Sequence, residues 1–286
     1  MKAPPIVRWA RAASVASITV FLSGCLAGPV VVDTPTRPRT ATLPPLRPPP
    51  PAPPPPPPSV LEAPGGGRIA VKPGRAGHVV AAPHGDSDLH TVEIATEVAE
   101  RSGFSLVIAT DFWTDPRTVA GPRRRHHVNR PLEGVPGRPA SEEVATPAAR
   151  DTYLTYERRV QEAAQGPLLF YAEIHGNGRL ESAARVEIAT IGVDADLAVR
   201  FRTLFELIRD AHLRGRPGVP RLEIVVDPAD TIYFLASSAK RDGILRRAQR
   251  GVHVELPMAA RTAGRDAYAA ILADFFAQAA ALPSGR

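Results

Sequence analysis

Two kinds of hydrophobic pattern alternate along residues 68–286 of the chain. Short apolar runs that are typical of buried strands are followed by longer segments in which apolar residues recur at helical spacing. The helical spacing is clearest over residues 196–213. Its apolar face comprises Leu197, Phe201, Leu204, Phe205 and Ile208. Strands that alternate with helices favour a three-layer α/β/α fold with a mainly parallel or mixed central sheet.

The positions of the individual elements follow from the same patterns. We predict strands at residues 78–82, 105–112, 168–175, 186–193, 222–226 and 252–256. We predict helices at residues 91–102, 148–165, 196–213, 237–249 and 265–281. Ligands of such sheets bind beyond the carboxyl ends of the strands. Polar residues at these ends are therefore the first candidates for a functional site.

Residues 1–24 have the features of a secretory signal peptide. Basic residues precede an apolar stretch that is shorter than the ~20 residues that a membrane-spanning helix needs. The stretch ends in LSGC, which resembles the bacterial lipobox, and this resemblance implies that Cys25 is the lipid-modified first residue of the mature protein. The alternative is that Cys25 is an ordinary core cysteine. Because Leu26 rather than aspartate follows it, we expect a lipid-anchored protein of the bacterial cell envelope, with the periplasmic side of the outer membrane favoured.

The next segment, residues 25–67, is rich in proline and contains the run TLPPLRPPPPAPPPPPPSV. Such a sequence cannot form a core and favours extended polyproline II, which rises about 3.1 Å per residue. We predict a lipid-anchored linker that holds the domain at residues 68–286 away from the membrane. Binding of the proline run by a partner with an aromatic groove is the alternative.

The basic character of the chain lies mostly in this N-terminal part. Six of the 35 Lys and Arg residues but only two of the 29 Asp and Glu residues fall within residues 1–65. The remaining residues carry 29 basic and 27 acidic side chains, so we expect no nucleic-acid partner. The cluster RRRHH at residues 123–127 is expected to be a solvated loop, with His126 and His127 as loop residues rather than ligands.

The chain has one cysteine, so any metal ion in the folded domain must be held by His and carboxylate side chains. Such side chains occur where predicted strands end. His84 follows the first strand, and His175 ends the strand at residues 168–175. Glu173 shares a strand face with His175, as His253 does with Glu255. Burying these groups together is costly unless they bind a ligand or pair with one another.

Four short motifs resemble the N-formylglutamate amidohydrolase family. They are PHGDSD at 83–88, VNRPLEG at 128–134, EIHGNG at 173–178 and VELP at 254–257. The family belongs with the zinc carboxypeptidases to a group of α/β zinc-dependent amide hydrolases, so the resemblance implies a zinc-dependent exopeptidase-like fold. It covers about residues 78–280. No single motif is specific, but all four occur in the family's order.

The resemblance implies that His84 and His175 are zinc ligands, with a carboxylate of the first motif as the third. The carboxypeptidase pattern has a glutamate three residues after the first histidine, where this chain has Ser87. Asp86 and Asp88 therefore compete for the role. We favour Asp88 as the ligand and Asp86 as a partner that orients an imidazole. The alternative for Asp88 is the N-cap of a helix that begins at the next residue.

The resemblance also implies the remaining roles. Glu255 matches the family's catalytic glutamate, which moves a proton from a zinc-bound water to the leaving amine. Asn129 and Arg130 match the pair that holds a substrate carboxylate, although Arg130 could instead form a salt bridge that fixes its own loop. We expect Glu173 to support His175 from outside the ligand set. The other histidines, His78, His90, His212 and His253, are expected to be structural or exposed, although His253 could line the pocket.

Together these features predict a membrane-tethered, zinc-dependent hydrolase. It would cleave an amide bond in a carboxylate-bearing acyl-amino acid or peptide, including peptides derived from the cell wall. A surface loop within residues 113–147 could close over the site. One alternative is a catalytically inactive binding or structural lipoprotein that keeps the hydrolase fold. Another is an interaction protein whose functional part is the proline-rich linker.

Overall fold

The computed structural model describes residues 58–62, 66–115 and 121–283. The predicted signal peptide, the lipidation of Cys25 and most of the predicted linker lie outside these residues and stay predictions. No helix in the described part of the chain is long and apolar enough to cross a membrane.

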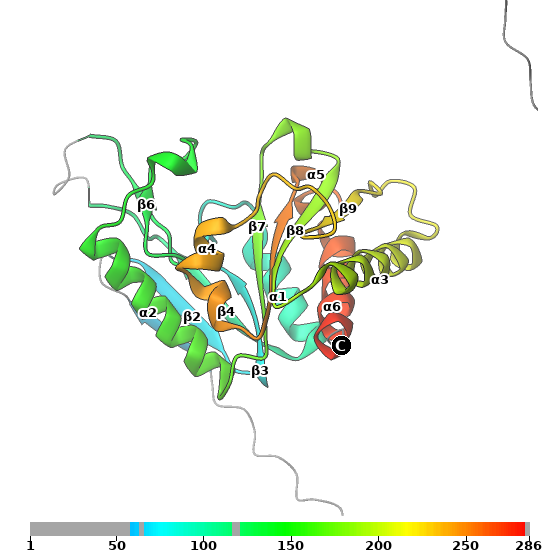
Figure 1. Cartoon of the computed structure of the whole chain (residues 1–286), viewed down its shortest axis with the longest axis horizontal. Helices are drawn as coiled ribbons and strands as arrows, with labels where there is room; N and C mark the ends of the chain where they lie inside the picture. Colours follow the sequence, from blue (N-terminus) through cyan, green and yellow to red (C-terminus); the bar gives the residue numbers. More distant parts are fainter. Residues whose placement is uncertain (1–57, 63–65, 116–120, 284–286) are drawn as a thin grey trace, which may run out of the picture. The chain divides into compact units, whose positions relative to one another are not determined.

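The centre of the domain is an eight-stranded sheet with the order β1-β2-β4-β3-β7-β10-β8-β9 (Figure 1). The strands β3, β4, β7 and β10 run parallel to one another, whereas β2 and β8 run antiparallel to β4 and β10. The sheet is therefore mixed. The strands are β1 Ser59–Glu62, β2 Arg68–Lys72, β3 Arg75–Ala82, β4 Phe104–Thr110, β7 Phe170–Gly176, β8 Arg185–Ile191, β9 Glu223–Val226 and β10 Arg250–Leu256.

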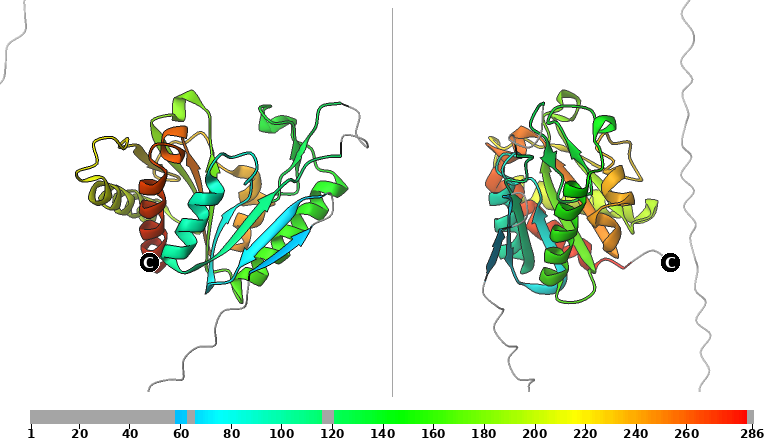
Figure 2. Two further views of the ribbon diagram at one scale, coloured as in Figure 1. Left: turned by 180° about the vertical axis from the view of Figure 1, so that it is seen from behind. Right: turned by 90° about the vertical axis from the view of Figure 1, so that its left-hand side faces the viewer.

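Helices cover both faces of this sheet (Figures 1 and 2). One face packs against α1 Thr91–Ser102, α3 Ala195–Leu213 and α6 Arg265–Ala281. The other packs against α2 Pro147–Ala164 and α4 Ser237–Arg241. A short helix, α5 Met258–Arg261, follows β10. The predicted three-layer α/β/α fold with a mixed sheet is confirmed.

The central strands are buried on both faces, which explains their continuous apolar runs. In β3, Val80 and Ala82 belong to the core beneath α1 and α6, whereas Val79 and Ala81 belong to the core beneath α2. The same alternation in β7 places Tyr171 on the α2 side. It therefore directs the side chains of residues 173 and 175 to that side.

The sequence predictions differ from the structure in three places. The cluster RRRHH was predicted to be a solvated loop, which is wrong, because residues 125–126 form a strand and His126 and His127 are buried. The single helix predicted at 237–249 is wrong, because α4 ends at Arg241 and a separate 3₁₀ turn, Ile244–Arg247, follows. Between them, Gly243 lies so close to the carbonyl oxygen of Asn129 that a Cβ there would clash. The strands β1 and β2 were not predicted. All four residues of β1 are exposed, so β1 has no apolar pattern and is defined only by its pairing with β2.

Two short strands pair with each other within the described residues 121–147. Arg125–His126 (β5) pairs antiparallel with Glu133–Gly134 (β6). A 3₁₀ turn, Ala140–Glu142, precedes α2. This segment supplies the VNRPLEG motif and lies beyond the carboxyl ends of the central strands (Figure 1).

Candidate metal centre

Three adjacent parallel strands, β3, β7 and β10, bring the candidate residues to one edge of the sheet. His84 lies two residues beyond β3, and His175 is the last residue but one of β7. In the register of β10 with β7, Glu255 is opposite His175 and His253 is opposite Glu173. These four side chains therefore form two neighbouring rows on one face.

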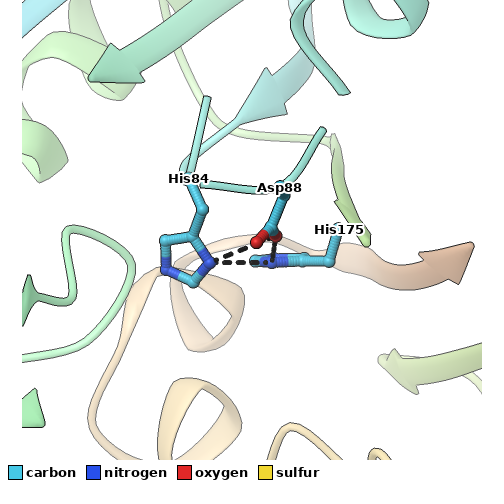
Figure 3. A group of neighbouring side chains, drawn as sticks. All are labelled: His84, Asp88 and His175. Carbon is cyan, nitrogen blue, oxygen red and sulfur yellow. Dashed lines mark hydrogen bonds and ion pairs between the residues drawn. The ribbon is translucent and has the colours of Figure 1, made fainter. Parts of the chain in front are cut away.

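His84, Asp88 and His175 meet with the spacing of a metal site (Figure 3). The two Nδ1 atoms are 3.2 Å apart, and Oδ2 of Asp88 is 3.4 Å from each of them. Tetrahedral zinc with bonds of ~2.0–2.1 Å separates its ligand atoms by about 3.3 Å. The observed triangle has this size, so the three side chains could hold one zinc ion with little movement. We call them the metal triad.

A tight turn after β3 explains why both His84 and Asp88 reach this point. The carbonyl oxygen of His84 accepts hydrogen bonds from the backbone N–H groups of Ser87 and Asp88, at 3.0 and 2.9 Å. The Asp88 carboxylate also accepts from the N–H of Gly176 in β7, at 3.2 Å. Asp88 is not the helix cap, because α1 begins after His90.

The structure separates the two competing aspartates. Only Asp88 belongs to the metal triad. The carboxylate of Asp86 accepts a 2.6 Å hydrogen bond from the indole N–H of Trp113. No contact of Asp86 with an imidazole is found among the described residues, so the orienting role predicted for it has no geometric support.

The electrostatics of the metal triad favour a positive charge at its centre. Burial, reinforced by nearby Arg125, holds the pKa of His84 well below its usual value. Burial also lowers the pKa of His175, but Asp88 and Glu173 outweigh it and raise this pKa to about 10. Burial opposes ionisation of Asp88, yet the two imidazoles hold the pKa of its carboxyl far below the ordinary range. In the metal-free protein the proton on His175 supplies this positive charge.

A second possible ligand group, Glu173, His175 and His253, has the geometry of hydrogen bonding instead. Nδ1 of His253 is 2.6 Å from Oε1 of Glu173, which is shorter than the ~3.3 Å between two ligands of one zinc ion and normal for a charge-assisted hydrogen bond. Nε2 of His253 is 2.9 Å from Oε1 of Glu255. His253 therefore bridges the two carboxylates.

The bridge itself was not predicted: His253 was expected to be structural or exposed, with a place in the pocket lining as the alternative, and it does line a cavity beside Glu255. Its ring also stacks on His175, with centroids 4.1 Å apart. Both ring nitrogens of His253 thus face carboxylate oxygens. The only sequence signal was the two-residue spacing that places His253 and Glu255 on one strand face.

Glu173 anchors the buried end of this arrangement. Burial favours its neutral form, but hydrogen bonding with His175 and His253 outweighs burial and lowers the pKa of Glu173. Its carboxylate also accepts from the side-chain amide of Asn129 and the hydroxyl of Tyr171, at 3.2 and 3.3 Å. Glu173 was predicted to support His175, but its shortest contact is with His253.

Asn129 and Arg130 lie beside this network with different surroundings. Asn129 is fully buried; besides holding Glu173, its side-chain oxygen accepts a 3.2 Å hydrogen bond from Arg130. The guanidinium of Arg130 donates two further hydrogen bonds to Glu143, at 3.0 and 2.6 Å. Arg130 therefore faces the site, and it also forms the salt bridge that was the alternative prediction.

A cavity of about 310 Å³ opens next to these groups. His253, Glu255, Arg130 and Glu143 line it on the polar side, and residues 233–236 form its apolar wall. Buried Glu187 fixes this wall, because its carboxylate accepts from the backbone N–H groups of residues 233 and 234, at 2.7 and 3.0 Å. A ligand in this cavity would contact Glu255 directly.

Arg261 holds the loops of the site together and was not predicted. Its guanidinium donates to the carbonyl oxygens of Leu89, Asn177 and Leu256, at 2.8, 3.0 and 3.1 Å. These residues follow or end the three strands that supply the site. The guanidinium packs against Gly176 so closely that a Cβ there would clash. An arginine in a short C-terminal helix gives no sequence signal of such a role.

Comparison with known proteins gives a limited result. No protein-family model and no curated protein matches the chain significantly. A bacteriophage poly-γ-glutamate hydrolase shares 15% identity over 74% of this chain and 88% of that chain, with a TM-score of 0.41. A gene product of Agrobacterium tumefaciens shares 14% identity over 74% of this chain and 92% of that chain, with a TM-score of 0.42. A mutant of murine aminoacylase 3 shares 12% identity over 72% of this chain and 66% of that chain, with a TM-score of 0.33. Similarity at this level does not transfer an activity.

Proposed function

We propose that this protein is a zinc-dependent hydrolase that cleaves an amide bond in a carboxylate-bearing acyl-amino acid or peptide. The observation that carries the proposal is the metal triad, whose donor atoms are 3.2–3.4 Å apart. Two imidazoles and one carboxylate are a common ligand set of catalytic zinc, which keeps a fourth position for water or substrate. Bound zinc would lower the pKa of a water molecule and polarise the substrate carbonyl.

The protein's own residues account for the remaining tasks. Glu255 lines the cavity and is the candidate base that takes a proton from water and passes it to the leaving nitrogen. His253 holds the Glu255 carboxylate in place, and buried Glu173 holds His253. Arg130 offers a planar pair of donors that suits a substrate carboxylate.

The predicted cellular location narrows the class of substrate. The predicted lipid anchor at Cys25 and the predicted linker place the domain in the cell envelope, outside the cytoplasm. Peptides with a free carboxylate, including those released from the cell wall, fit this location better than formylated amino acids do. We therefore propose a peptide or acyl-amino acid substrate, contact with cell-wall material and membrane attachment through Cys25, with no nucleic-acid partner.

Metal analysis is the direct test of the proposal. Residues 25–286 with Cys25→Ala, hereafter the unlipidated chain, would be purified and compared with its His84→Ala and His175→Ala variants by elemental analysis. We expect about one zinc ion per chain, lost in both variants, together with hydrolysis of carboxylate-bearing peptides. A metal-free parent whose melting temperature does not respond to zinc would favour a binding or structural lipoprotein instead.

The alternative in which the linker is the functional part is tested separately. Deletion of residues 36–58 from the unlipidated chain should leave hydrolysis of small peptides in solution unchanged, because every residue of the proposed site lies beyond residue 83. Loss of activity on this deletion would contradict the proposal.

A further inference from the structure

The arginine proposed to bind a substrate carboxylate already binds one. Nε and Nη2 of Arg130 donate to the two oxygens of Glu143 in the two-pronged geometry that Arg uses for carboxylates. The Arg130 and Glu143 side chains are 16% and 10% exposed, so the pair is largely shielded from water. Nη1 donates to Asn129. Each side of the guanidinium fork is therefore engaged within the protein.

Glu143 reaches this position from an exposed segment. Residues 136–142, directly before it, are all exposed. Besides Arg130, the carboxylate contacts Nε2 of His127 at 3.1 Å. The contacts with His127 and Arg130 overcome burial and lower the pKa of Glu143, so it is a carboxylate anion at neutral pH. It thus has the charge and the shape of the group that Arg130 would take from a ligand.

The pair also lies where a ligand would have to pass. Arg130 and Glu143 line the 310 Å³ cavity that contains Glu255. They also line a second cavity of about 130 Å³, whose other lining residues include Arg124, Arg125 and His127. The Arg130–Glu143 pair therefore forms the wall between a catalytic cavity and a basic one. A ligand carboxylate in either cavity can make the two-pronged bond only after Glu143 leaves.

We propose that Glu143 is an internal competitor that occupies Arg130 in the free protein and is displaced by the carboxylate of the substrate. Ligands without a carboxylate cannot replace the bond that Glu143 gives up, so the exchange selects for carboxylate-bearing ligands. It also couples ligand binding to movement of the segment before Glu143 and joins the two cavities. The inference rests on the proposed function, since it takes Arg130 as the group that holds the substrate.

The chain contains a matched control for this pair. Glu133, on the same segment, contacts Nε of Arg124 at 3.1 Å and Nε2 of His126 at 3.3 Å. The side chains of Glu133 and Glu143 are buried to nearly the same degree. Glu133, however, lines neither of the two cavities. Glu133→Gln therefore removes an equivalent charge from an equivalent Arg and His without opening a ligand site.

The test measures binding of N-acetylglycine and of its neutral amide, N-acetylglycinamide, by calorimetry. Parent, Glu143→Gln and Glu133→Gln forms of the unlipidated chain would be compared, with thermal melts to confirm folding. We expect Glu143→Gln to bind N-acetylglycine about tenfold more tightly than the parent, and Glu133→Gln to match the parent. Affinity for N-acetylglycinamide should be the same in all three.

Unchanged or weaker binding of N-acetylglycine by a folded Glu143→Gln variant would overturn the inference and leave the pair as a structural salt bridge. An equal gain in affinity for N-acetylglycine in Glu133→Gln would overturn the inference too, because the gain would then come from the lower negative charge of the protein and not from the release of Arg130. If Glu143→Gln does not fold, Glu143→Asp is measured instead. Aspartate keeps the charge but has a shorter side chain that reaches Arg130 less well, so we expect a smaller gain in affinity for N-acetylglycine. If the protein binds no zinc and hydrolyses no peptide, but Glu143→Gln still binds N-acetylglycine more tightly than the parent, the hydrolase proposal is refuted and the role of Glu143 as internal competitor is not.

Discussion

The Nδ1 atoms of His84 and His175 lie 3.2 Å apart, although the two residues are separated by 91 positions in the chain. Two imidazole nitrogens at this distance repel each other unless a proton or a metal ion lies between them. The Asp88 carboxylate completes the arrangement on one side, and the proposed proton acceptor Glu255 follows on the next strand. The pair of histidines therefore indicates where a cation belongs.

The two aspartates of the first motif should differ sharply in their effect on zinc binding. Asp88→Asn removes an anionic donor of the metal triad, and we expect zinc affinity to fall by more than the ~10–100-fold that is typical for loss of a partner outside the ligand set. Asp86→Asn should leave zinc affinity nearly unchanged, because Asp86 bonds to Trp113. Competition with a fluorescent chelator measures the zinc affinity of each variant. A larger loss of affinity in Asp86→Asn than in Asp88→Asn would exclude Asp88 as the ligand.

Zinc should stabilise the protein more strongly as the pH rises. In the metal-free protein burial lowers the pKa of His175, but Asp88 and Glu173 raise it to about 10, above the ~6.5 of an unfolded chain. Its proton stabilises the fold fully below about pH 6.5, and this contribution is lost as the pH rises through 10. Zinc competes with that proton.

The difference in melting temperature with and without zinc should therefore grow between about pH 7 and pH 9. Differential scanning fluorimetry measures it, and Asp88→Asn, which removes one source of the raised pKa, should flatten the trend. A difference that shrinks over this range would show that no proton is displaced from the site.

Replacement of Glu255 should separate chemistry from binding. We expect Glu255→Gln to lower kcat by about 10²–10⁴-fold while zinc content and KM change little, because the residue acts on the reacting proton. His253→Gln should lower kcat less, again with zinc retained, because it positions Glu255. His126→Gln is the control, since His126 contacts Glu133 and not Glu255. Steady-state kinetics with metal analysis checks all three; loss of zinc in Glu255→Gln would contradict the assigned role.

Arg261 should matter for stability more than an arginine in a short helix normally does. Arg261→Met removes hydrogen bonds to three backbone carbonyls, two of them in buried surroundings, which should lower the free energy of unfolding by about 2 kcal/mol or more. Arg265→Met replaces an arginine that is close in sequence but only half-buried and paired with Asp266, and it should change the free energy of unfolding by less than about 0.5 kcal/mol. Urea unfolding measures both, and equal effects would refute the role of Arg261.

Local patterns were sufficient where a residue's role depends on its own segment. The helix α1 has the predicted bounds Thr91–Ser102, because its apolar positions repeat within one element. The two-residue spacing in β7 and β10 also placed Glu173, His175, His253 and Glu255 on one face, as the strand register shows. Such inferences need only the period of a strand.

Roles that depend on tertiary neighbours were not predictable in this way. The Arg130–Glu143 pair joins residues across an irregular loop, and Arg261 contacts a residue 172 positions away. Nothing in either local sequence distinguishes these side chains from exposed ones. The edge strand β1 was missed for a related reason, because its stability comes from backbone pairing and not from buried side chains.

The register of that edge strand also fixes its direction within the sheet. Glu62 pairs with Arg68, which in turn lies beside Thr110 at the end of β4 nearest the metal triad, whereas Ser59 pairs with Val71, which lies beside Val107 in the middle of β4. The strand β1 therefore begins farther from the metal triad than it ends, and it runs parallel to β4. Five strands, β1, β3, β4, β7 and β10, thus share one direction, so that their carboxyl ends all point to the edge of the sheet that carries the metal triad.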